Sequence, residues 1–311
     1  EPENSDHQIG TIMGNRVCDV LSIQYPLLMG AITDKVRLAA AVSEAGGLGC
    51  IDGNVTPEHL RQDIREFRKI SSRPFSANFP LKSTPAKTLQ ERMEIIAEEH
   101  VPVVLSSAGS PAQWTNFLHD AGVLVAHVVP TVYHARKAVE AGVDVVVGEA
   151  YESGGFRGDT DVTTMVLIPA IRRALPDVPL VAAGTISDRY GYVAARALGA
   201  DGVQVGTRLI ATHEAEFPDH YKKLILAADD TSTMSAEGPL RPRISKPEFA
   251  ERVLGETKRI QMGQGAALID SLLSVEEVFH ELFRGGAEHA RRVAEEIEAF
   301  SSAAMAANAA E

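Results

Sequence analysis

The stretch PLVAAGTISDRYGYVAARALGADGVQVGTRL, residues 179–209, decides the fold. Two short apolar runs, PLVAAG and DGVQVG, flank a segment with helical spacing, and the second run is introduced by the phrase LGADG. A strand, a helix and a second strand in this order predict two parallel neighbours in one sheet. Each run also ends in a glycine followed by a threonine, so the two strands share a design at their carboxyl ends.

The same unit recurs along the chain. Helical spacing separates the runs, as in residues 36–46, 56–70 and 163–175. The apolar runs are residues 25–31, 47–52, 74–80, 101–107, 122–129, 143–148, 179–184 and 201–206. Near-continuous apolar strands that alternate with amphipathic helices indicate a parallel sheet covered by helices. Eight such units are the number in a closed (β/α)8 TIM barrel, which is the fold class we predict.

An open, doubly wound sheet is the competing architecture. It would normally carry the fingerprint GxGxxG between its first strand and the following helix. The glycine-rich stretch AGGLGCIDG, residues 45–53, lies before and within the second predicted strand instead. The sequence therefore favours the barrel. Beyond residue 210 the alternation weakens, and we expect helices and loops packed on or over the barrel.

Composition excludes several classes of protein. The 311 residues carry a formal net charge of -12, which argues against a nucleic-acid partner. Cys18 and Cys50 are far apart, which argues against a thiolate zinc site and fits a reducing compartment. No metal site is expected. No run of about 18 apolar residues predicts a membrane span, and the polar amino terminus does not resemble a signal peptide. We expect a cytoplasmic protein.

The ends of the seventh and eighth strands predict an anion site. Gly184 and Thr185 follow one strand, and Gly206 and Thr207 follow the other. Backbone N–H groups, hydroxyls and a helix N-terminus bind phosphate, and in barrels the loops after these two strands are its usual position. The alternative is that the glycines only serve tight turns. The shared design favours a phosphorylated ligand.

Six phrases together resemble one family. They are LAAAVSEAGGLGCI, FSANFPL, GEAYESGGFRG, VAAGTISD, LGADGVQVGTR and QMGQG. They are similar to the nitronate monooxygenase (2-nitropropane dioxygenase) family and, within it, to the flavin-type bacterial enoyl-acyl-carrier-protein reductase. The resemblance runs from about residue 20 to residue 295. It implies a (β/α)8 barrel that binds FMN beneath a smaller helical part.

The resemblance also implies a set of cofactor contacts. Met29, Gly30 and Ala31 would lie along the isoalloxazine, and Asn78 occupies the position of the family's ring-contacting asparagine. For Asn78 a local hydrogen bond is the alternative. Glu149 falls where many members have glutamine. The remaining predicted contacts are Gly154 and Gly155, which would let their loop approach FMN, and Gly184, Thr185, Gln204, Val205, Gly206 and Thr207 around the phosphate.

The resemblance divides the chain into parts. Residues 15–210 and 265–300 would form the FMN-binding barrel, residues 211–264 a helical or loop lid, and residues 1–14 and 301–311 flexible ends. The interval between residues 235–246 and residues 261–265 is shorter than the family's lid. A more open site is expected, with Met262 and Gln264 near the substrate. For Met262 the alternative is core packing.

Phe156 departs from the family pattern. The family has histidine after Glu-x-Gly-Gly, and nitronate-oxidising members use it to handle a proton, which a phenyl ring cannot do. Phe156 is therefore predicted to line an apolar substrate pocket. Tyr151 and His127 are the candidate catalytic acids or bases. Each has a simpler alternative, a ring packed at the barrel rim for Tyr151 and a hydrogen-bonded core residue for His127.

These features predict an FMN-dependent oxidoreductase. NADH or NADPH would reduce an activated C=C bond in an enoyl thioester or a related unsaturated carbonyl compound. One alternative is a nitronate monooxygenase with a relocated base. Another is a flavin- or phosphate-binding barrel used for isomerisation or regulation. The expected partner is a small-molecule or acyl-thioester substrate. A homodimer is a further possibility for such a barrel.

Overall fold

The structure is a computed structural model that describes residues 14–32, 36–82, 84–238 and 241–308. Eight strands form one parallel sheet in the order β1-β8-β7-β6-β5-β4-β3-β2. The strands are β1 (Leu27–Met29), β2 (Gly49–Asp52), β3 (Phe75–Pro80), β4 (Val103–Ser107), β5 (Leu124–Val129), β6 (Val145–Glu149), β7 (Leu180–Ala183) and β8 (Gly202–Val205). All eight coincide with predicted runs, because a strand buried on both faces needs a continuous apolar stretch.

The sheet closes on itself. Leu28 and Leu48 form a parallel bridge between the two end strands. The Leu48 N–H donates to the Leu27 carbonyl at 2.8 Å, and the Met29 N–H donates to the Leu48 carbonyl at 2.9 Å. The predicted (β/α)8 barrel is thus confirmed, and the open sheet is excluded.

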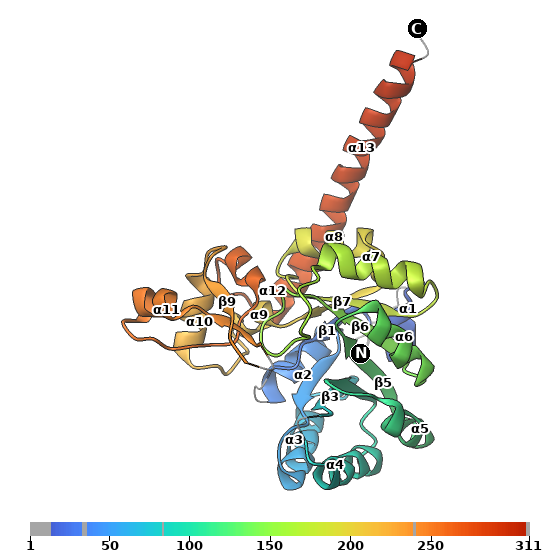
Figure 1. Ribbon diagram of the computed structural model, residues 1–311, viewed down its shortest axis with the longest axis vertical. Helices are drawn as coiled ribbons and strands as arrows, with labels where there is room; N and C mark the ends of the chain where they lie inside the picture. The colour runs from blue at the N-terminus through green and yellow to red at the C-terminus, as the bar shows by residue number, and fades with distance from the viewer. Residues whose placement is uncertain (1–13, 33–35, 83, 239–240, 309–311) are drawn as a thin grey trace, which may run out of the picture.

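Helices surround the barrel (Figure 1). They are α1 (Arg16–Leu21), α2 (Val36–Glu44), α3 (Pro57–Ile70), α4 (Ala86–Glu98), α5 (Ala112–Asp120), α6 (Val132–Glu140), α7 (Thr164–Ala174) and α8 (Arg189–Ala197). In α3, Leu60, Ile64 and Phe67 are fully buried at the spacing of one helix face. The Thr56 hydroxyl caps this helix by accepting from the His59 N–H. The three predicted helices are confirmed.

A smaller lobe, residues 211–269, follows β8 and the short α9 (Thr207–Ile210). It contains α10 (Asp219–Leu226), β9 (Thr233–Ser235), β10 (Arg243–Ser245), α11 (Pro247–Leu254) and the 3₁₀ helix η1 (Gln264–Leu268). Its apolar residues form a cluster separate from the barrel core. The antiparallel pair β9–β10 was not expected, because each strand has three residues and no apolar run announces it.

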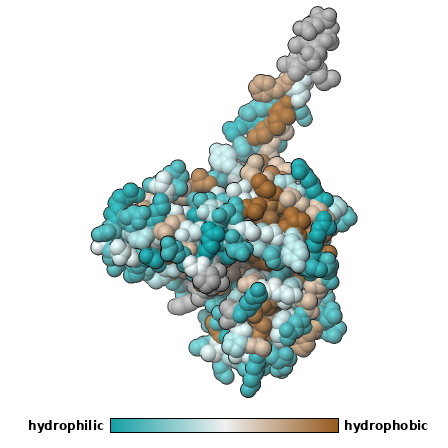
Figure 2. Space-filling view, viewed as in Figure 1, coloured by the Kyte–Doolittle hydropathy of each residue, from teal (hydrophilic) through white to brown (hydrophobic). Residues whose placement is uncertain are grey.

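The chain then returns to the barrel. Helix α12 (Val275–Phe279), the π-helical turn η2 (His280–Gly285) and α13 (Gly286–Asn308) follow one another directly. The start of α13 packs on α8, and the rest extends away from the barrel (Figure 1). Ile297 is 61% exposed and Phe300 is 79% exposed. Figure 2 shows hydrophobic surface on this extending helix. The end regions predicted to be flexible lie partly outside the described residues, at 1–13 and 309–311.

No helix in the described ranges is both long enough and apolar enough to cross a membrane.

Candidate active site at the barrel mouth

The carboxyl ends of the parallel strands meet at one mouth of the barrel, where enzymes of this fold hold their active sites. Most predicted site residues lie there because they end a strand or follow one directly. Met29 ends β1, Glu149 ends β6, Gly184 follows β7 and Gly206 follows β8. The structure thus brings together residues that are far apart in sequence. Gly30 and Gly206 are in close contact, since a Cβ added to Gly30 would lie 3.3 Å from the Gly206 Cα.

The predicted phosphate site lies at the ends of β7 and β8, and two features there bear on the prediction. The Thr185 hydroxyl oxygen is buried and has no hydrogen-bond partner among the described residues. Thr185 adopts a left-handed backbone with φ of 61°, which is unfavourable for a β-branched residue and is typical of functional sites. A Cβ added to Gly206 would meet no atom within 4 Å. Because β7 and β8 are neighbours, the unused Thr185 hydroxyl and the unfilled position at Gly206 follow adjacent strand ends. Both features are compatible with a phosphate group at this place.

Thr207 and Gln204 lie beside this space in different environments. The Thr207 hydroxyl accepts a hydrogen bond from the Gly263 N–H at 3.0 Å, and its own hydrogen remains free to donate. Gln204 is 8% exposed on β8, and Val205 is buried. Their predicted contacts with a phosphate stay predictions, and the polar groups at this site are available for them.

The residues predicted along the ring of a flavin differ in accessibility. Met29 is buried, whereas Ala31 is exposed and Gly30 is half-buried. Asn78 is 8% exposed, and its amide nitrogen donates to the Leu105 carbonyl at 3.0 Å. The local hydrogen bond considered as an alternative is therefore present. It fixes the amide plane and leaves a ring contact as a prediction.

Glu149 supplies a carboxyl group that is a weaker acid than an ordinary glutamate. Burial raises its pKa to about 7, while a hydrogen bond with Ser153 and the positive charge of Arg157 partly oppose that change. At neutral pH a large fraction of this group is protonated and can donate a hydrogen bond. Glu149 can thus play the part of the family's glutamine, which also donates hydrogen bonds.

Gly154 and Gly155 serve a contact within the protein. A Cβ on Gly154 would lie 2.6 Å from the Gly263 nitrogen, and one on Gly155 would lie 2.8 Å from the Gln261 side-chain oxygen. Gly155 also has a positive φ of 73°. The loop after β6 thus approaches the segment 261–265 of the lobe. This contact explains the two glycines, whereas the sequence predicted that they allow an approach to FMN. The Gln264 N–H strengthens this contact by donating to the Glu152 carbonyl at 3.0 Å.

Met262 and Phe156, the two predicted pocket residues, lie in opposite environments. Met262 is fully buried in the apolar cluster of the lobe, the packing role considered as its alternative. This placement does not favour a substrate contact. Phe156 is 59% exposed on the loop after β6. Its ring is available to a ligand at the mouth and does not line an enclosed cavity.

Tyr151 lies between the barrel and the β9–β10 hairpin. The guanidinium carbons of Arg157 and Arg243 lie 4.2 and 4.5 Å from the centre of its ring. Hydrogen bonds with Ser235 and Arg243, followed by the positive charges of Arg243 and Arg157, lower the pKa of Tyr151. A phenol in this position can give or take a proton, so Tyr151 remains a candidate acid.

His127 lies on β5, where its Nδ1 is 2.7 Å from the Ser106 hydroxyl. The residue is 4% exposed. Burial lowers its pKa to about 4, so the imidazole is neutral near pH 7. This environment is that of a hydrogen-bonded core histidine. A catalytic role for His127 stays a prediction with less structural support than that of Tyr151.

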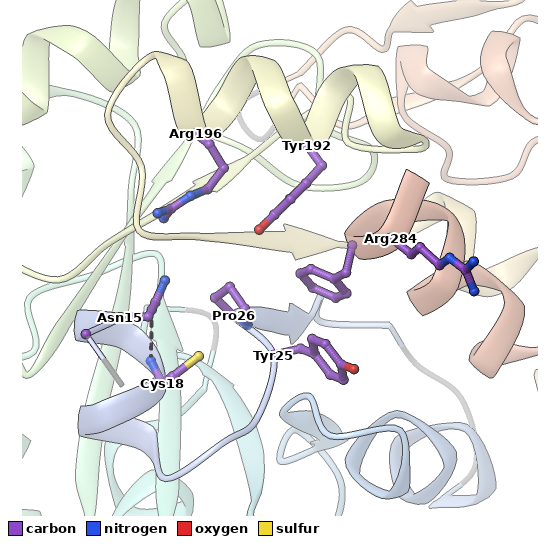
Figure 3. A pocket seen from close by; sticks show the side chains of 9 residues that line it. Asn15, Cys18, Tyr25, Pro26, Tyr192, Arg196 and Arg284 are labelled. Carbon is purple, nitrogen blue, oxygen red and sulfur yellow. Dashed lines mark hydrogen bonds between the residues drawn. The ribbon is translucent and has the colours of Figure 1, made fainter. Parts of the chain in front are cut away.

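A surface cavity lies away from the mouth. It has a volume of about 480 Å³ and is lined by Asn15, Cys18, Tyr25 and Tyr192, among others (Figure 3). Pro26, which precedes β1, also lines it, so it lies at the amino ends of the strands. Within the described residues, no cluster of three His, Cys, Asp or Glu side chains could hold a metal ion.

Arg157 and Arg243 are functional candidates that sequence reasoning missed. Arg157 follows Phe156 inside the quoted motif, but nothing in the motif indicates its burial. Arg243 lies 92 residues from Tyr151 and reaches it only through the hairpin. The phrase SAEGPLRPRISK, residues 235–246, contained the one available signal, a pair of arginines in a segment assigned to the lid.

Comparison with known proteins defines the class. Residues 15–91 and 80–243 match the sequence profile "Nitronate monooxygenase". FabK from Thermotoga maritima superimposes with a TM-score of 0.82 and 34% identity, covering 91% of this chain and 99% of that one. Nitroalkane oxidase from Streptomyces ansochromogenes shares the fold, with a TM-score of 0.79 and 23% identity over 89% of this chain and 99% of that one.

Two curated relatives extend the comparison. A probable nitronate monooxygenase of Staphylococcus haemolyticus is 31% identical over 71% of this chain and 74% of its own length. A (3aS,4S,5R,7aS)-5-hydroxy-7a-methyl-1-oxo-octahydro-1H-indene-4-carboxyl-CoA dehydrogenase of Rhodococcus jostii is 31% identical over 71% of this chain. The match spans 62% of the length of that dehydrogenase.

The barrel and its relatives define a flavin-dependent oxidoreductase. The chain belongs to the nitronate monooxygenase family, as its motifs predicted. This membership sets aside the alternative of a barrel without redox chemistry.

The pKa of His127 generates a prediction about stability. Its ordinary pKa is 6.5 and its folded value is about 4, so between these values the unfolded chain binds a proton that the folded protein does not. Stability from this group is complete above pH 6.5 and is lost as the pH falls toward 4. At about 1.4 kcal/mol per pH unit, the loss is about 3 kcal/mol.

Urea denaturation at pH 7 and pH 4 measures this difference. The wild type should lose about 3 kcal/mol more than His127→Gln over this interval. The folded pKa of Glu149 is raised, so its contribution to stability increases as the pH falls. This contribution is the same in both proteins and does not affect their difference. The exposed His213→Gln is the control and should behave as wild type. Equal losses in wild type and His127→Gln would contradict the assignment.

Proposed function

We propose that the protein is an FMN-dependent enzyme that uses NADH or NADPH to reduce an activated C=C bond in an acyl thioester or a related unsaturated carbonyl compound. The observation that carries the proposal is the unpaired, buried Thr185 hydroxyl after β7, together with the unfilled position at Gly206 after the neighbouring strand β8. It supports a phosphorylated ligand at the end of β7 and β8. Similarity to FabK over 99% of that chain supports the reductase assignment.

The choice of FMN rests on the number of phosphate sites. The sequence predicts one such site and has no second glycine fingerprint for the adenylate half of FAD. FMN, when bound, supplies hydride transfer between the nicotinamide and the substrate. We propose that Thr185, Thr207 and the backbone at Gly206 hold its phosphate, and that Asn78 and Glu149 offer hydrogen bonds to its ring.

A thioester is the preferred substrate class for two reasons. A relative with 31% identity is named as a carboxyl-CoA dehydrogenase, which acts on a CoA compound. Phe156 is exposed at the mouth and offers an apolar surface to an acyl chain. Tyr151 would give the proton that the α-carbon requires, because its phenol lies on the same loop.

Nitronate monooxygenation is the second candidate. The family profile and the relative from Staphylococcus haemolyticus favour it. Phe156 stands against it, because the phenyl ring occupies the position of the family's proton-handling histidine. This reaction would require Tyr151 or His127 to act as the relocated base.

We also propose that the protein acts in the cytoplasm as a homodimer. Cys18 and Cys50 are both free and buried, which suits a reducing compartment. Val293, Ile297 and Phe300 recur at spacings of four and three residues along α13, and Ile297 and Phe300 are largely exposed. Such a stripe is typical of a helix that pairs with another helix, and an isolated helix of this length is marginally stable in water.

Stopped-flow spectroscopy of the flavin tests the proposed reaction. NADH or NADPH should bleach the flavin without oxygen, and an enoyl thioester should then restore the oxidised spectrum faster than oxygen or a nitronate does. Rapid reoxidation by thioester alone would support the reductase. Reoxidation by oxygen coupled to nitronate consumption, with no effect of thioester, would replace it by the monooxygenase.

Gly206 provides a prediction about cofactor content. Gly206→Leu should fold and yet be isolated colourless, because the new side chain would enter the open space proposed for the phosphate. The flavin absorbance per protein should fall at least tenfold, while the urea midpoint of the cofactor-free protein stays unchanged. Val205→Ile is a matched control, since Val205 is buried beside the site and the change adds volume without entering that space. A fully yellow Gly206→Leu protein would remove this assignment.

Phe156 provides a prediction about reaction choice. The wild type should oxidise alkyl nitronates slowly or not at all, whereas Phe156→His should raise that rate by about 10² to 10⁴. The same change should weaken binding of an unsaturated thioester, because the apolar contact is lost. Phe156→Leu keeps the apolar character and is the control. Vigorous nitronate oxidation by wild type that survives Tyr151→Phe and His127→Gln together would contradict the account.

The stripe on α13 provides a prediction about assembly. Ile297→Glu combined with Phe300→Glu should convert a dimer into a monomer, because two exposed apolar contacts become charged. Light scattering coupled to size exclusion measures the mass. Glu295→Gln together with Glu298→Gln, at sites elsewhere on the exposed part of α13, should leave the dimer intact. A wild type that is monomeric at all concentrations would contradict the homodimer.

A further inference from the structure

Tyr151 is contacted by two arginines from distant parts of the chain. Arg157 lies on the loop after β6, and Arg243 lies on β10 in the lobe. Their guanidinium carbons are 4.2 and 4.5 Å from the centre of the Tyr151 ring. The Gly155–Arg243 bridge holds the loop and the hairpin together, with hydrogen bonds of 2.9 and 3.0 Å. The arrangement is therefore built into the backbone as well as the side chains.

Both arginines are buried. The Arg157 side chain is 1% exposed, and Arg243 is 2% exposed. Arg243 donates from Nε to the Tyr151 carbonyl at 3.2 Å and from Nη1 to the Thr233 hydroxyl at 3.0 Å. Arg157 donates from Nη2 to the Ser235 hydroxyl. These partners are uncharged, so they satisfy donors without neutralising either cation.

Three donors of this pair have no partner in the described part of the chain. They are Nε and Nη1 of Arg157 and Nη2 of Arg243. Buried charges in proteins are normally paired, because desolvation is costly. The carboxylate oxygen of Asp161 lies 4.0 Å from Arg157 Nη1, but its side chain is 61% exposed and it also pairs with Arg241 at 3.4 Å. The buried cluster thus carries excess positive charge.

Two acidic groups lie within reach of this charge. Glu149 is affected by Arg157, but burial raises its pKa to about 7 and so opposes its ionisation, whereas the phenol of Tyr151 is affected by both arginines. Ser235, Arg243 and Arg157 are the polar groups that act on it, and all of them favour the deprotonated oxygen. Arg241 and Asp161 form an ion pair and act on Arg157 with opposite signs. A negative oxygen on Tyr151 would supply the anion that the two guanidinium groups lack.

We propose that Arg157 and Arg243 are positioning residues that stabilise the phenolate form of Tyr151 and so make it a stronger acid. This use of the phenolate rests on the proposed reductase function. The Tyr151 O–H bond breaks as a C–H bond forms at the substrate α-carbon. The carbon's electron pair takes the proton, and the electron pair of the O–H bond stays on the phenolate oxygen. Water then returns a proton to Tyr151.

The arrangement also accounts for proton handling without the family histidine. Phe156 occupies the histidine position and directly precedes Arg157 in the loop. Phe156, which cannot handle a proton, and Arg157, which strengthens the acid Tyr151, are therefore consecutive residues. The acid strength needed near neutral pH comes from two fixed cations in place of an imidazole.

Ultraviolet titration of phenolate absorbance tests the proposal without substrate. The protein contains six tyrosines, so the difference between wild type and Tyr151→Phe isolates Tyr151. Its midpoint should lie below the ordinary value of about 10, and Arg157→Met should raise it by about one pH unit or more. The exposed Tyr133, isolated in the same way with Tyr133→Phe, is the control and should not respond to Arg157→Met.

Two further variants separate charge from folding. Arg157→Lys keeps the charge and should restore most of the downward shift of the Tyr151 midpoint. Ser235→Ala removes a hydrogen bond but leaves both cations, so it should raise the midpoint by less than Arg157→Met does. Equal midpoints for Tyr151 and Tyr133, unchanged by Ser235→Ala and Arg157→Met, would overturn the proposal. Activity is a separate measurement. If the Tyr151 midpoint is lowered and rises in Arg157→Met as proposed, but the enzyme does not reduce a thioester, the proposed function alone would be overturned.

Discussion

The hydrogen bonds between β1 and β2 close the sheet at Leu28 and Leu48, and the geometry of the mouth depends on this closure. An open sheet would leave the end of β1 far from the end of β2. In the closed barrel, β1 instead lies between β2 and β8, and the Gly30 N–H donates to the Val205 carbonyl at 2.8 Å. That contact brings Gly30 to Gly206, so residues proposed for the ring and for the phosphate of one cofactor become neighbours.

The lobe adds a second constraint at the same mouth. Its segment 261–265 packs against the loop after β6, and Gly154 and Gly263 allow the two backbones to approach. The hairpin contributes Arg243, whose backbone bonds to Gly155 and whose side chain bonds to the Tyr151 carbonyl. The loop that carries Tyr151 and Phe156 is thus fixed by the lobe. The chemistry proposed for this loop therefore depends on residues that the barrel itself does not supply.

Sequence patterns predicted the barrel because its strands are buried on both faces. The run VVVG in β6 and the run LVAA in β7 have no polar alternation that would permit another sheet type. The positions of the residues proposed for the phosphate could be predicted for a related reason. Gly184, Thr185 and Gly206 follow strand ends directly, and strand ends have a fixed place in this fold.

Contacts made by the lobe could not be predicted in the same way. Short strands such as β9 and β10 leave no periodic signal, so the approach of Arg243 to Tyr151 depends on tertiary pairing alone. Gly154 shows the same limit. A glycine pair indicates close approach, but the pattern does not say whether a cofactor or another loop approaches, and in the structure Gly263 fills that position.

The relative affinity of the cofactor-free protein for FMN and for riboflavin tests the central claim most directly, because the two ligands share the ring and differ in the phosphate. Thr185, Thr207 and the backbone at Gly206 can contact only the phosphate in this account. Titration followed by flavin fluorescence should give a dissociation constant for FMN at least about 100-fold below that for riboflavin, equivalent to about 2.7 kcal/mol. Equal dissociation constants would contradict a phosphate site at the ends of β7 and β8.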